Sequence, residues 1–268
     1  MKLSHHRYGR LVAALTLVFF ASTAAGQTPA PKQAPAKKPA PAAGTKAAHS
    51  GPDPALLHPA TLKAQAPETF QVKFETTAGD FTVNVTRAWS PLGADRFYNL
   101  CKHHFFNGAP FFRVHPGFMV QFGISSQPAV SKAWDSAVIK DDAHKESNRT
   151  GTITFATAGP NTRTTQLFIN YADNTFLDSQ GFTPFGAVSE GMDVVTKIYS
   201  GYGEMPAMGG QGPAPEKIES EGTPYLEKNF PKIDSIKTTT IIGEPAAAPA
   251  HKAPAAKPAP KPAAKPQS

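Results

Sequence analysis

The chain has 268 residues, with 27 lysines and arginines, 20 aspartates and glutamates, 27 prolines and a net charge of +7. The positive charge lies towards the ends, because residues 67–243 carry 15 basic and 18 acidic side chains. A folded nucleic-acid-binding module concentrates basic residues on the domain itself, so we exclude nucleic acid as a partner. The only cysteine, Cys101, excludes an internal disulfide, and the fold must depend on its hydrophobic core.

Composition divides the chain into four segments. Residues 1–25 resemble a signal peptide, with basic residues before an apolar run and small residues after it. That run is about ten residues long, whereas a spanning helix needs ~20, so we expect no integral membrane span. Residues 26–66 and 244–268 are rich in Pro, Ala and Lys, and both are predicted to be disordered. We therefore expect an exported protein, periplasmic or secreted, with one folded domain over residues 67–243.

In chain order, the domain begins with a predicted hairpin. Phe70, Val72 and Phe74 alternate with polar residues, and the alternation resumes after the turn TAGD. Residues 90–104 predict a helix with Ser90 as its N-cap. Six further strands and a second short helix complete the domain; we expect the strands at 111–115, 118–122, 152–157, 166–170, 182–188 and 236–241, and the helix at 190–201.

Eight strands with only two helices do not fit alternating βαβ units. They favour an all-β fold, mainly antiparallel: a closed eight-stranded β-barrel with two capping helices, flanked by the disordered Pro/Ala/Lys-rich tails. A barrel of about eight strands is filled by its own side chains. A binding site is therefore expected on the outside of the barrel.

The stretch PFFRVHPGFMVQFG, residues 110–123, holds one guanidinium and one side-chain amide in a run that otherwise has the pattern of buried strand. Taken alone, Arg113 and Gln121 fit the wet face of a strand, with the arginine lying over its neighbours. Their position beside Phe118 and Met119, across a short Pro-Gly turn, instead has the composition of a peptide groove. Such a groove combines polar groups that orient a peptide with apolar groups that hold a ring.

Three blocks together resemble the cyclophilin-type peptidyl-prolyl cis-trans isomerases: FFRVHPGFMVQFG, GTITFATAGPNTRTTQLFIN and FLDSQGFTPFGAVSEGMDVVTKI. They have the family's order and spacing, and the similarity runs from about Thr77 to Ile198. The resemblance implies an eight-stranded barrel with two helices. It also implies an enzyme that rotates X-Pro peptide bonds in unfolded or extended proteins, without a metal, a cofactor or a covalent step.

The resemblance extends to individual residues of the site. Arg113 matches the catalytic arginine, Gln121 the amide that orients it, and Phe118 one of the pair that receives the proline ring. The substrate-binding positions that the resemblance implies are Met119, Ala156, Thr157, Gln166, Phe168, Phe176 and Leu177.

The chain departs from the family at several positions. Thr157 stands where asparagine is common, and Phe176 stands where a tryptophan is usual, which predicts weak binding of the cyclic peptide cyclosporin. The loop after Gly123 lacks the usual glycine-rich run. We therefore expect an intact primary groove with altered secondary contacts.

Two other functions stay open from the sequence alone. One is a chaperone or scaffold module that binds Pro-containing segments with little turnover. The other gives the basic tails a weak electrostatic contact with anionic envelope polymers, which is compatible with isomerase activity. We expect the protein to be a monomer.

Three remaining features are interpreted as structural. The glycine-rich segment GYGEMPAMGGQG, residues 201–212, reads as a mobile surface excursion, and Asp141-Asp142 reads as a solvated loop pair. No metal site is expected, because no zinc-like ligand spacing accompanies His103, His104 and His115.

Overall fold

The sheet begins with the predicted hairpin. The computed structural model of the chain describes residues 51–243, in which β1 (Thr69–Thr76) and β2 (Asp80–Thr86) pair antiparallel. Phe74 lies opposite Phe81, and their stacked rings have centroids 4.6 Å apart. Because side chains alternate along a strand, the pattern that predicted the hairpin turns one face of β1 into the core.

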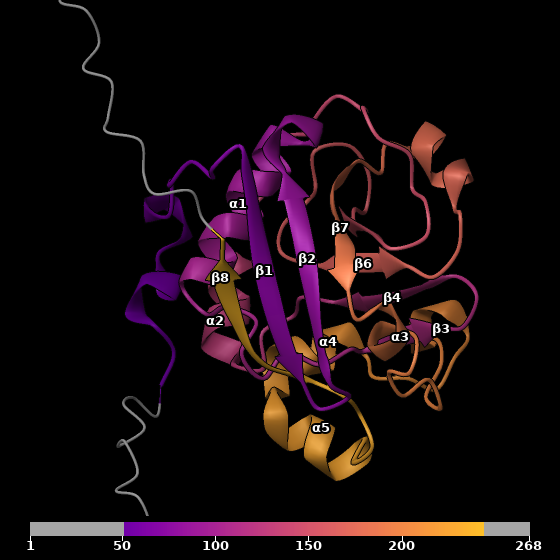
Figure 1. The fold of residues 1–268 in the computed structure, drawn as a ribbon. Coiled ribbons are helices and arrows are strands. Elements are labelled where there is room, and N and C mark those ends of the chain that lie inside the picture. The colour runs from indigo at the N-terminus through magenta and orange to yellow at the C-terminus, as the bar shows by residue number, and fades with distance from the viewer. Residues whose placement is uncertain (1–50, 244–268) are drawn as a thin grey trace, which may run out of the picture. The chain divides into compact units, whose positions relative to one another are not determined.

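Eight strands form one antiparallel sheet in the order β3-β4-β6-β5-β7-β2-β1-β8 (Figure 1). The strands after the hairpin are β3 (Arg113–His115), β4 (Met119–Phe122), β5 (Thr152–Phe155), β6 (Leu167–Asn170), β7 (Pro184–Glu190) and β8 (Ile236–Ile242). All six predicted segments are strands, and only their ends differ. The antiparallel all-β class predicted from the sequence is therefore confirmed.

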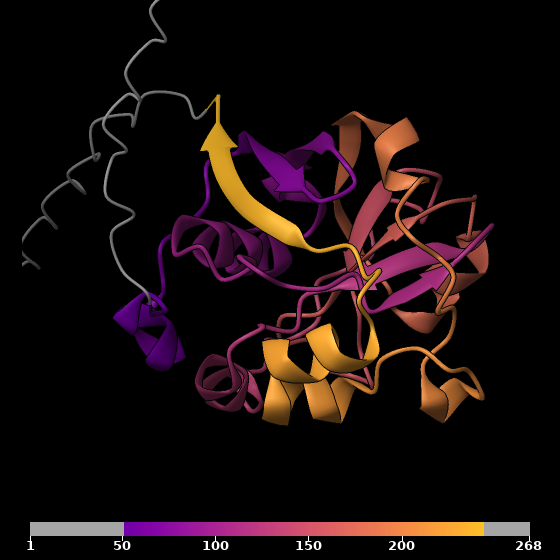
Figure 2. The same ribbon diagram turned by 90° about the horizontal axis from the view of Figure 1, so that it is seen from below.

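The two edges of the sheet meet at one point. β3 and β8 are not paired along their length, but Pro110 and Ser235, which precede them, form an isolated antiparallel bridge. Beside it, the Phe111 amide donates to the Asp234 carbonyl at 2.9 Å. Figure 2 shows β8 arching from this junction across to β1. Closure of the predicted barrel is therefore not confirmed, because β3 and β8 approach each other at this bridge but are not paired with each other.

The first predicted helix covers the sheet through an aromatic core. α1 (Pro91–Lys102) buries Phe97 completely. The Phe97 ring centroid lies 5.0 Å from that of Phe185 and 5.9 Å from that of Phe106. Leu100 is also fully buried, so this helix packs on the sheet through Phe97 and Leu100.

A residue from far along the chain caps α1. Ser90 occupies the N-cap position, but its side chain makes no capping bond to the helix. The Asp142 carboxylate instead accepts from the amides of Leu92 and Gly93, both at 3.0 Å, and from the Ser90 hydroxyl. Arg163 donates to the same carboxylate at 3.1 Å. The interpretation of the acidic pair as solvated is therefore wrong for Asp142, whose side chain is 6% exposed.

Asp142 should stabilise the fold at neutral pH and much less in acid. Burial alone would raise its pKa, but the hydrogen bonds from Ser90 and the α1 amides and the charge of Arg163 outweigh burial, so the pKa lies below its ordinary value. A group with a lowered pKa stabilises the folded state above its unfolded pKa, and this stabilisation is lost as the pH falls through the folded pKa. Asp142→Asn should thus lower the free energy of unfolding at pH 7 by about 1–3 kcal/mol.

Urea unfolding at pH 7 and at acidic pH measures this effect. The difference between wild type and Asp142→Asn should narrow as the wild-type carboxylate becomes protonated. Asp193→Asn is the control, because the Asp193 side chain is 73% exposed and its ion pair with Lys197 lies in solvent. An undiminished difference in acid would contradict the assignment.

Three short helices were not predicted. They are α2 (Pro128–Trp134), α4 (Pro215–Glu221) and α5 (Thr223–Asn229), each with a proline in its first turn. Helices of this length are stable mainly through tertiary packing, and their few buried positions carry little periodicity for prediction. The second predicted helix, at 190–201, is shorter than expected, because α3 spans only Met192–Val195. None of the helices within residues 51–243 is long and apolar enough to cross a membrane.

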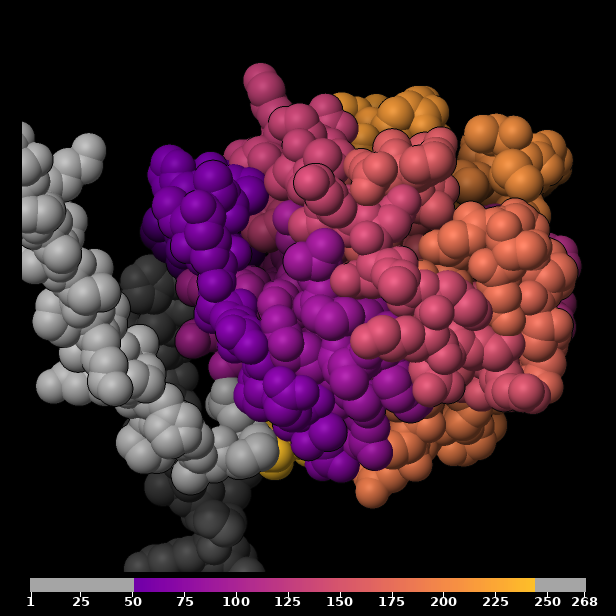
Figure 3. Space-filling view, turned by 90° about the horizontal axis from the view of Figure 1, so that it is seen from above, coloured from indigo at the N-terminus to yellow at the C-terminus, as the bar shows by residue number. Residues whose placement is uncertain are grey.

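Residues 51–66 belong to the folded body, which corrects the predicted disordered linker. The 3-10 helices η1 (Pro54–Leu57) and η2 (Pro59–Thr61) begin at prolines, whose fixed φ suits such turns. Leu56 is 3% exposed, and the Trp134 indole of α2 donates to its carbonyl at 2.8 Å. Figure 3 shows this start of the described chain, in indigo, lying against the rest of the body. Three parts of the predicted segments lie outside the described residues: 1–25, 26–50 and 244–268.

Leu56→Ala should lower the free energy of unfolding by about 2–4 kcal/mol, because it removes a buried side chain from the contact with α2. Leu57→Ala is a matched control one residue away, where the side chain is 41% exposed. Urea unfolding of both variants measures the difference. If both substitutions lowered the free energy of unfolding equally, the burial of Leu56 would not contribute to the stability of the core.

Candidate active site

Alternation along three neighbouring strands brings the predicted residues onto the outer face of the sheet. Arg113 on β3 lies opposite Gln121 on β4, and Gln121 lies opposite Phe168 on β6. The residues that alternate with them along each of these strands face the other side of the sheet and belong to the main core. Met119 and Phe168 instead form a separate small apolar cluster with Leu177. The chain thus builds an apolar patch on the outside of the sheet, with a guanidinium at its edge.

Hydrogen bonds connect the polar residues of this patch in a row. Arg113 Nη1 donates to Gln121 Oε1 at 3.1 Å, and Gln121 Nε2 donates to Gln166 Oε1 at 3.0 Å. The Arg113 guanidinium carbon lies 5.9 Å from the centre of the Phe118 ring. Gln121 therefore orients the arginine on one side and is itself oriented by Gln166 on the other.

A cavity of about 170 Å³ opens beside Arg113. Its base is apolar, because Met119, Phe168 and Leu177 are each at least 94% buried. The polar side chains of Arg113 and Gln121 lie at its wall. The cavity is lined by Arg113, Phe118, Met119, Gln121, Ala156, Thr157, Phe168, Leu177, Phe182 and Met205.

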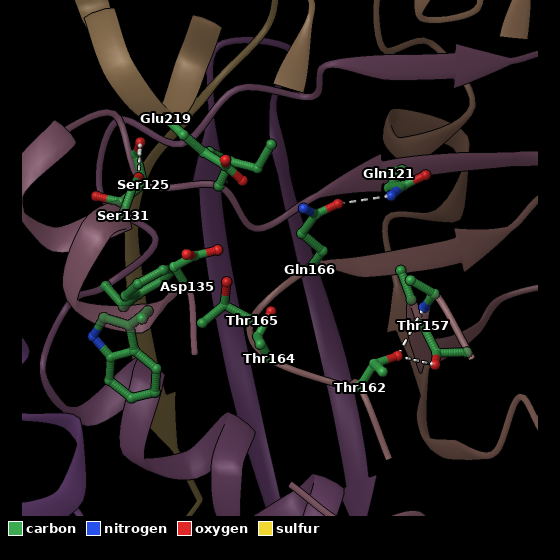
Figure 4. A pocket seen from close by; sticks show the side chains of 15 residues that line it. Gln121, Ser125, Ser131, Asp135, Thr157, Thr162, Thr164, Thr165, Gln166 and Glu219 are labelled. Carbon is green, nitrogen blue, oxygen red and sulfur yellow. Dashed lines mark hydrogen bonds between the residues drawn. The ribbon is translucent and has the colours of Figure 1, made fainter. Parts of the chain in front are cut away.

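Two predicted binding residues differ from the others: Thr157 lines the cavity but bonds within its own loop, and Phe176 lies outside the cavity lining. The Thr157 hydroxyl donates to the Gly159 carbonyl and pairs with Thr162 Oγ1 at 2.8 Å, so its hydrogen bonds stay within its own loop (Figure 4). Phe176 does not line the cavity; its ring is 55% exposed and stacks on Phe118 with centroids 6.0 Å apart. Phe176 therefore extends the rim of the apolar cavity.

A second cavity, of about 280 Å³, continues the groove (Figure 4). It shares Gln121, Ala156 and Thr157 with the first, and Gln166 lines it. Its far wall includes Asp135, which follows α2, and Glu219 of α4. Burial and the charges of nearby acids raise the pKa of Glu219. The groove therefore has an apolar end and an acidic end.

No metal site accompanies these acids. Within residues 51–243, no group of three or more histidine, cysteine or acidic side chains is placed to hold a metal ion.

Buried amides behind the apolar cavity hold its walls, and sequence patterns did not reveal them. Asn174 Nδ2 donates to the Phe118 carbonyl at 2.8 Å. The Asn148 amide and side chain both donate to Asp178 Oδ1, which anchors the segment that carries Leu177. The Asn148 side chain also donates to the carbonyl of Phe182 at 2.8 Å. Since all these partners are distant in the chain, no local pattern could have identified the amides.

An acidic side chain that was not predicted meets Arg113. Glu204 accepts from Arg113 Nε at 2.6 Å and from Nη2 at 3.0 Å. The Glu204 side chain is 22% exposed and the Arg113 side chain is 14% exposed. The next residue, Met205, lines the apolar cavity. Both lie in the glycine-rich segment 201–212, which was interpreted only as a mobile surface excursion. The sequence signal was weak: one carboxylate and one apolar side chain among glycines.

Comparisons with known proteins point to one family. The family model described as "Cyclophilin type peptidyl-prolyl cis-trans isomerase/CLD" matches residues 71–219. A peptidyl-prolyl cis-trans isomerase of Acinetobacter baylyi is 34% identical over 142 residues, which cover 51% of this chain and 76% of that protein. Peptidyl-prolyl cis-trans isomerase B of Escherichia coli is 35% identical over 136 residues, which cover 47% and 82%.

Among solved structures, a cyclophilin type peptidyl-prolyl cis-trans isomerase of Cryptosporidium parvum overlaps with a TM-score of 0.48 and 19% identity, over 66% of this chain and 99% of that one. The family match spans more than half of the chain, and the bacterial relatives are matched over more than two thirds of their length. By these matches, the chain belongs to the cyclophilin-type peptidyl-prolyl cis-trans isomerase family.

Proposed function

We propose that this protein catalyses cis-trans rotation of X-Pro bonds in exported, unfolded or extended proteins, with Arg113 as its catalytic residue. The isomerase reaction follows from the family to which the chain belongs. The observation that supports the residue assignment is the position of Arg113 at the wall of an apolar cavity on the outer face of the sheet.

The reaction needs a donor for one nitrogen atom. Rotation about a peptide bond faces a barrier of about 18–20 kcal/mol, because the planar amide is stabilised by resonance. In the twisted transition state this resonance is lost, and the prolyl nitrogen gains a localised lone pair. An N–H of Arg113 aimed at that nitrogen bonds the transition state better than the planar ground state, without proton transfer.

The rest of the site separates a fixed part of the substrate from a rotating part. The apolar cavity of Met119, Phe168 and Leu177 holds the proline ring. Gln121 and Gln166 face the acyl side, where their amides can hold the peptide chain. An acceleration of about 10⁵-fold requires about 7 kcal/mol of differential stabilisation, which one charged donor together with positioning can supply.

The proposal is tested by NMR exchange spectroscopy on a tetrapeptide with one X-Pro bond. Uncatalysed exchange takes tens to hundreds of seconds, so catalysis should produce exchange peaks between the cis and trans signals within about a second at micromolar enzyme. Wild-type protein that produces no exchange would refute isomerase activity.

One observation favours a second candidate function, a low-turnover module that binds Pro-containing segments. The Glu204 carboxylate pairs with Arg113 and offsets part of its charge. A binding module would show peptide-induced shifts at Phe118 and Phe168 but no exchange between cis and trans signals. The same spectra therefore distinguish the two functions.

Export and the tails complete the proposal. The apolar N-terminal segment supports export to the periplasm or the medium, and the lysine-rich ends support weak contact with anionic envelope polymers. Cell fractionation with N-terminal sequencing tests export, and a cytoplasmic protein with an intact N-terminus would refute it. Deletion of 28–50 and 244–268, which leaves the folded residues 51–66 in place, should abolish retention on such polymers at low salt, and retention by the truncated protein would refute the tail contact.

A further inference from the structure

The hydrogen bonds of Arg113 leave two of its donors available. A guanidinium has five N–H groups in a fixed planar fork. Glu204 accepts from Nε and Nη2, and Gln121 accepts from Nη1. One N–H on Nη1 and one on Nη2 remain, and Arg113 lines the apolar cavity. The carboxylate thus occupies the edge of the guanidinium formed by Nε and Nη2. One N–H on each terminal nitrogen stays available for a ligand.

The loop around Glu204 holds this carboxylate in place. The Gly212 amide donates to the Glu204 carbonyl at 2.8 Å. At Gly210 the backbone passes so close that an added Cβ would lie 2.0 Å from the Glu204 carbonyl oxygen and 2.6 Å from its Cβ. On the other side, the Val114 amide of β3 reaches the Gly203 carbonyl at 3.4 Å. The glycines therefore wrap the loop tightly around Glu204 and connect it to the strand of Arg113.

A second anchor lies next to this loop. The Tyr202 ring packs edge-on against Phe230, with centroids 5.0 Å apart. The Tyr202 hydroxyl accepts from the Lys232 amide at 3.1 Å. These two contacts fix Tyr202 on the body of the protein. They therefore also restrict the backbone position of Glu204, two residues later in the chain.

We propose that Glu204 is a positioning residue for the isomerase reaction: it holds the Arg113 guanidinium so that the donors left on Nη1 and Nη2 face the prolyl nitrogen. The inference rests on the proposed isomerase function and adds a residue to it. A bidentate carboxylate fixes both the direction and the rotation of a guanidinium, which a single bond from Gln121 does not. Arg113 would otherwise be a long side chain with several rotamers, and such freedom has to be lost when the substrate reacts.

Two opposing effects make the proposal testable. Orientation raises the rate, because misplacement of a catalytic group by about 1 Å can cost about 10²-fold. Partial neutralisation of Arg113 lowers the rate, because a less positive donor stabilises the lone pair less. If orientation dominates, removal of the carboxylate slows the reaction; if neutralisation dominates, Glu204 is a brake and its removal accelerates the reaction.

Two conservative variants separate charge from shape. Glu204→Gln keeps the shape but can accept only through one oxygen, whereas Glu204→Asp keeps the charge and both oxygens on a shorter side chain. We expect kcat to fall about tenfold in Glu204→Gln with KM changed less than about twofold. Glu204→Asp should retain more activity than Glu204→Gln. If only the shape of the side chain mattered, Glu204→Gln would be more active than Glu204→Asp.

Two further variants serve as comparisons. Met205→Ala alters the cavity lining in the same loop and should raise KM more than it changes kcat, since it removes contact with the ring. Glu227→Gln removes an exposed carboxylate on α5 and should leave both constants unchanged. Rates are measured over a range of peptide concentrations on the full chain.

A spectroscopic measurement reports the position of Arg113 without any activity. In wild type the Nε–H is donated to a carboxylate, so its proton should exchange slowly with water and give a resolved ¹H–¹⁵N signal, assigned by its loss in Arg113→Lys. In Glu204→Gln this signal should move and exchange faster, while backbone signals outside the site stay in place.

The outcomes are distinct. An inactive wild type refutes the isomerase function itself. An active wild type with an unchanged or faster Glu204→Gln variant overturns the positioning role, and so does an unchanged Nε–H signal. A slower Glu204→Gln with a displaced Nε–H signal supports the role.

Discussion

Arg113→Ala is expected to lower kcat/KM for X-Pro isomerisation by about 10²–10³-fold, the usual cost of removing one aimed donor from a transition state. Two groups near the prolyl nitrogen lose their partner at the same time. Gln121 Oε1 loses its donor, and the Glu204 carboxylate is left without the charge that balances it. An unpaired carboxylate beside a nitrogen that gains a lone pair should slow the reaction further. Part of the loss should therefore come from Glu204.

A double variant measures that part. Arg113→Ala combined with Glu204→Gln should be more active than Arg113→Ala alone, because the uncompensated charge is gone. Arg149→Ala is the matched control, since its side chain is 68% exposed and lies on the surface. The comparison is made by measuring kcat/KM for the peptide with wild type, Arg113→Ala, the double variant and Arg149→Ala. Retention of wild-type activity by Arg113→Ala would exclude this arginine from catalysis.

Phe97→Ala is expected to lower the free energy of unfolding by about 3–5 kcal/mol. Phe97 is fully buried where α1 meets the sheet, with Phe70, Phe74 and Phe185 around it. These rings belong to two strands, β1 and β7, and cannot all move to fill the space that is left. Most of the volume of the side chain should therefore remain as a cavity.

Urea or guanidinium unfolding of Phe97→Ala, followed by far-UV circular dichroism, measures the loss. Leu92→Ala on the same helix is the control: its side chain is 43% exposed, and it should cost well under about 1 kcal/mol. A loss at Phe97 as small as at Leu92 would mean that the aromatic cluster collapses freely into the space. It would also show that the packing of α1 through Phe97 contributes little to the stability of the sheet.

The predictable parts of this fold and site are those governed by local patterns. Alternation predicted the two strands of the hairpin, because each has one face in the core, and the other six strands were predicted as short segments between turns and loops. The same alternation explains why Arg113, Gln121 and Phe168 lie in one row, once β3 and β4 are joined by a short turn. The family resemblance then identified the apolar cavity.

The parts that were missed depend on partners distant in the chain. Asp142 caps a helix that begins about fifty residues earlier, and Glu204 meets an arginine about ninety residues earlier. Leu56 lies in a Pro/Ala-rich stretch whose composition resembles a disordered linker, yet α2 buries it. Glu204 was hidden for a related reason, since glycines that wrap closely around a side chain have the same composition as a flexible loop.

The pairing of the first strand with the last has a consequence for how the chain reaches its native state. Phe74 of β1 lies opposite Thr239 of β8, almost at the other end of the described chain. A contact of such long range forms slowly, because most of the polypeptide has to be ordered first. A chain that emerges N-terminus first, from a ribosome or a translocation channel, exposes one edge of β1 until the residues of β8 have followed. This isomerase therefore completes its own sheet only after the residues of β8 have emerged.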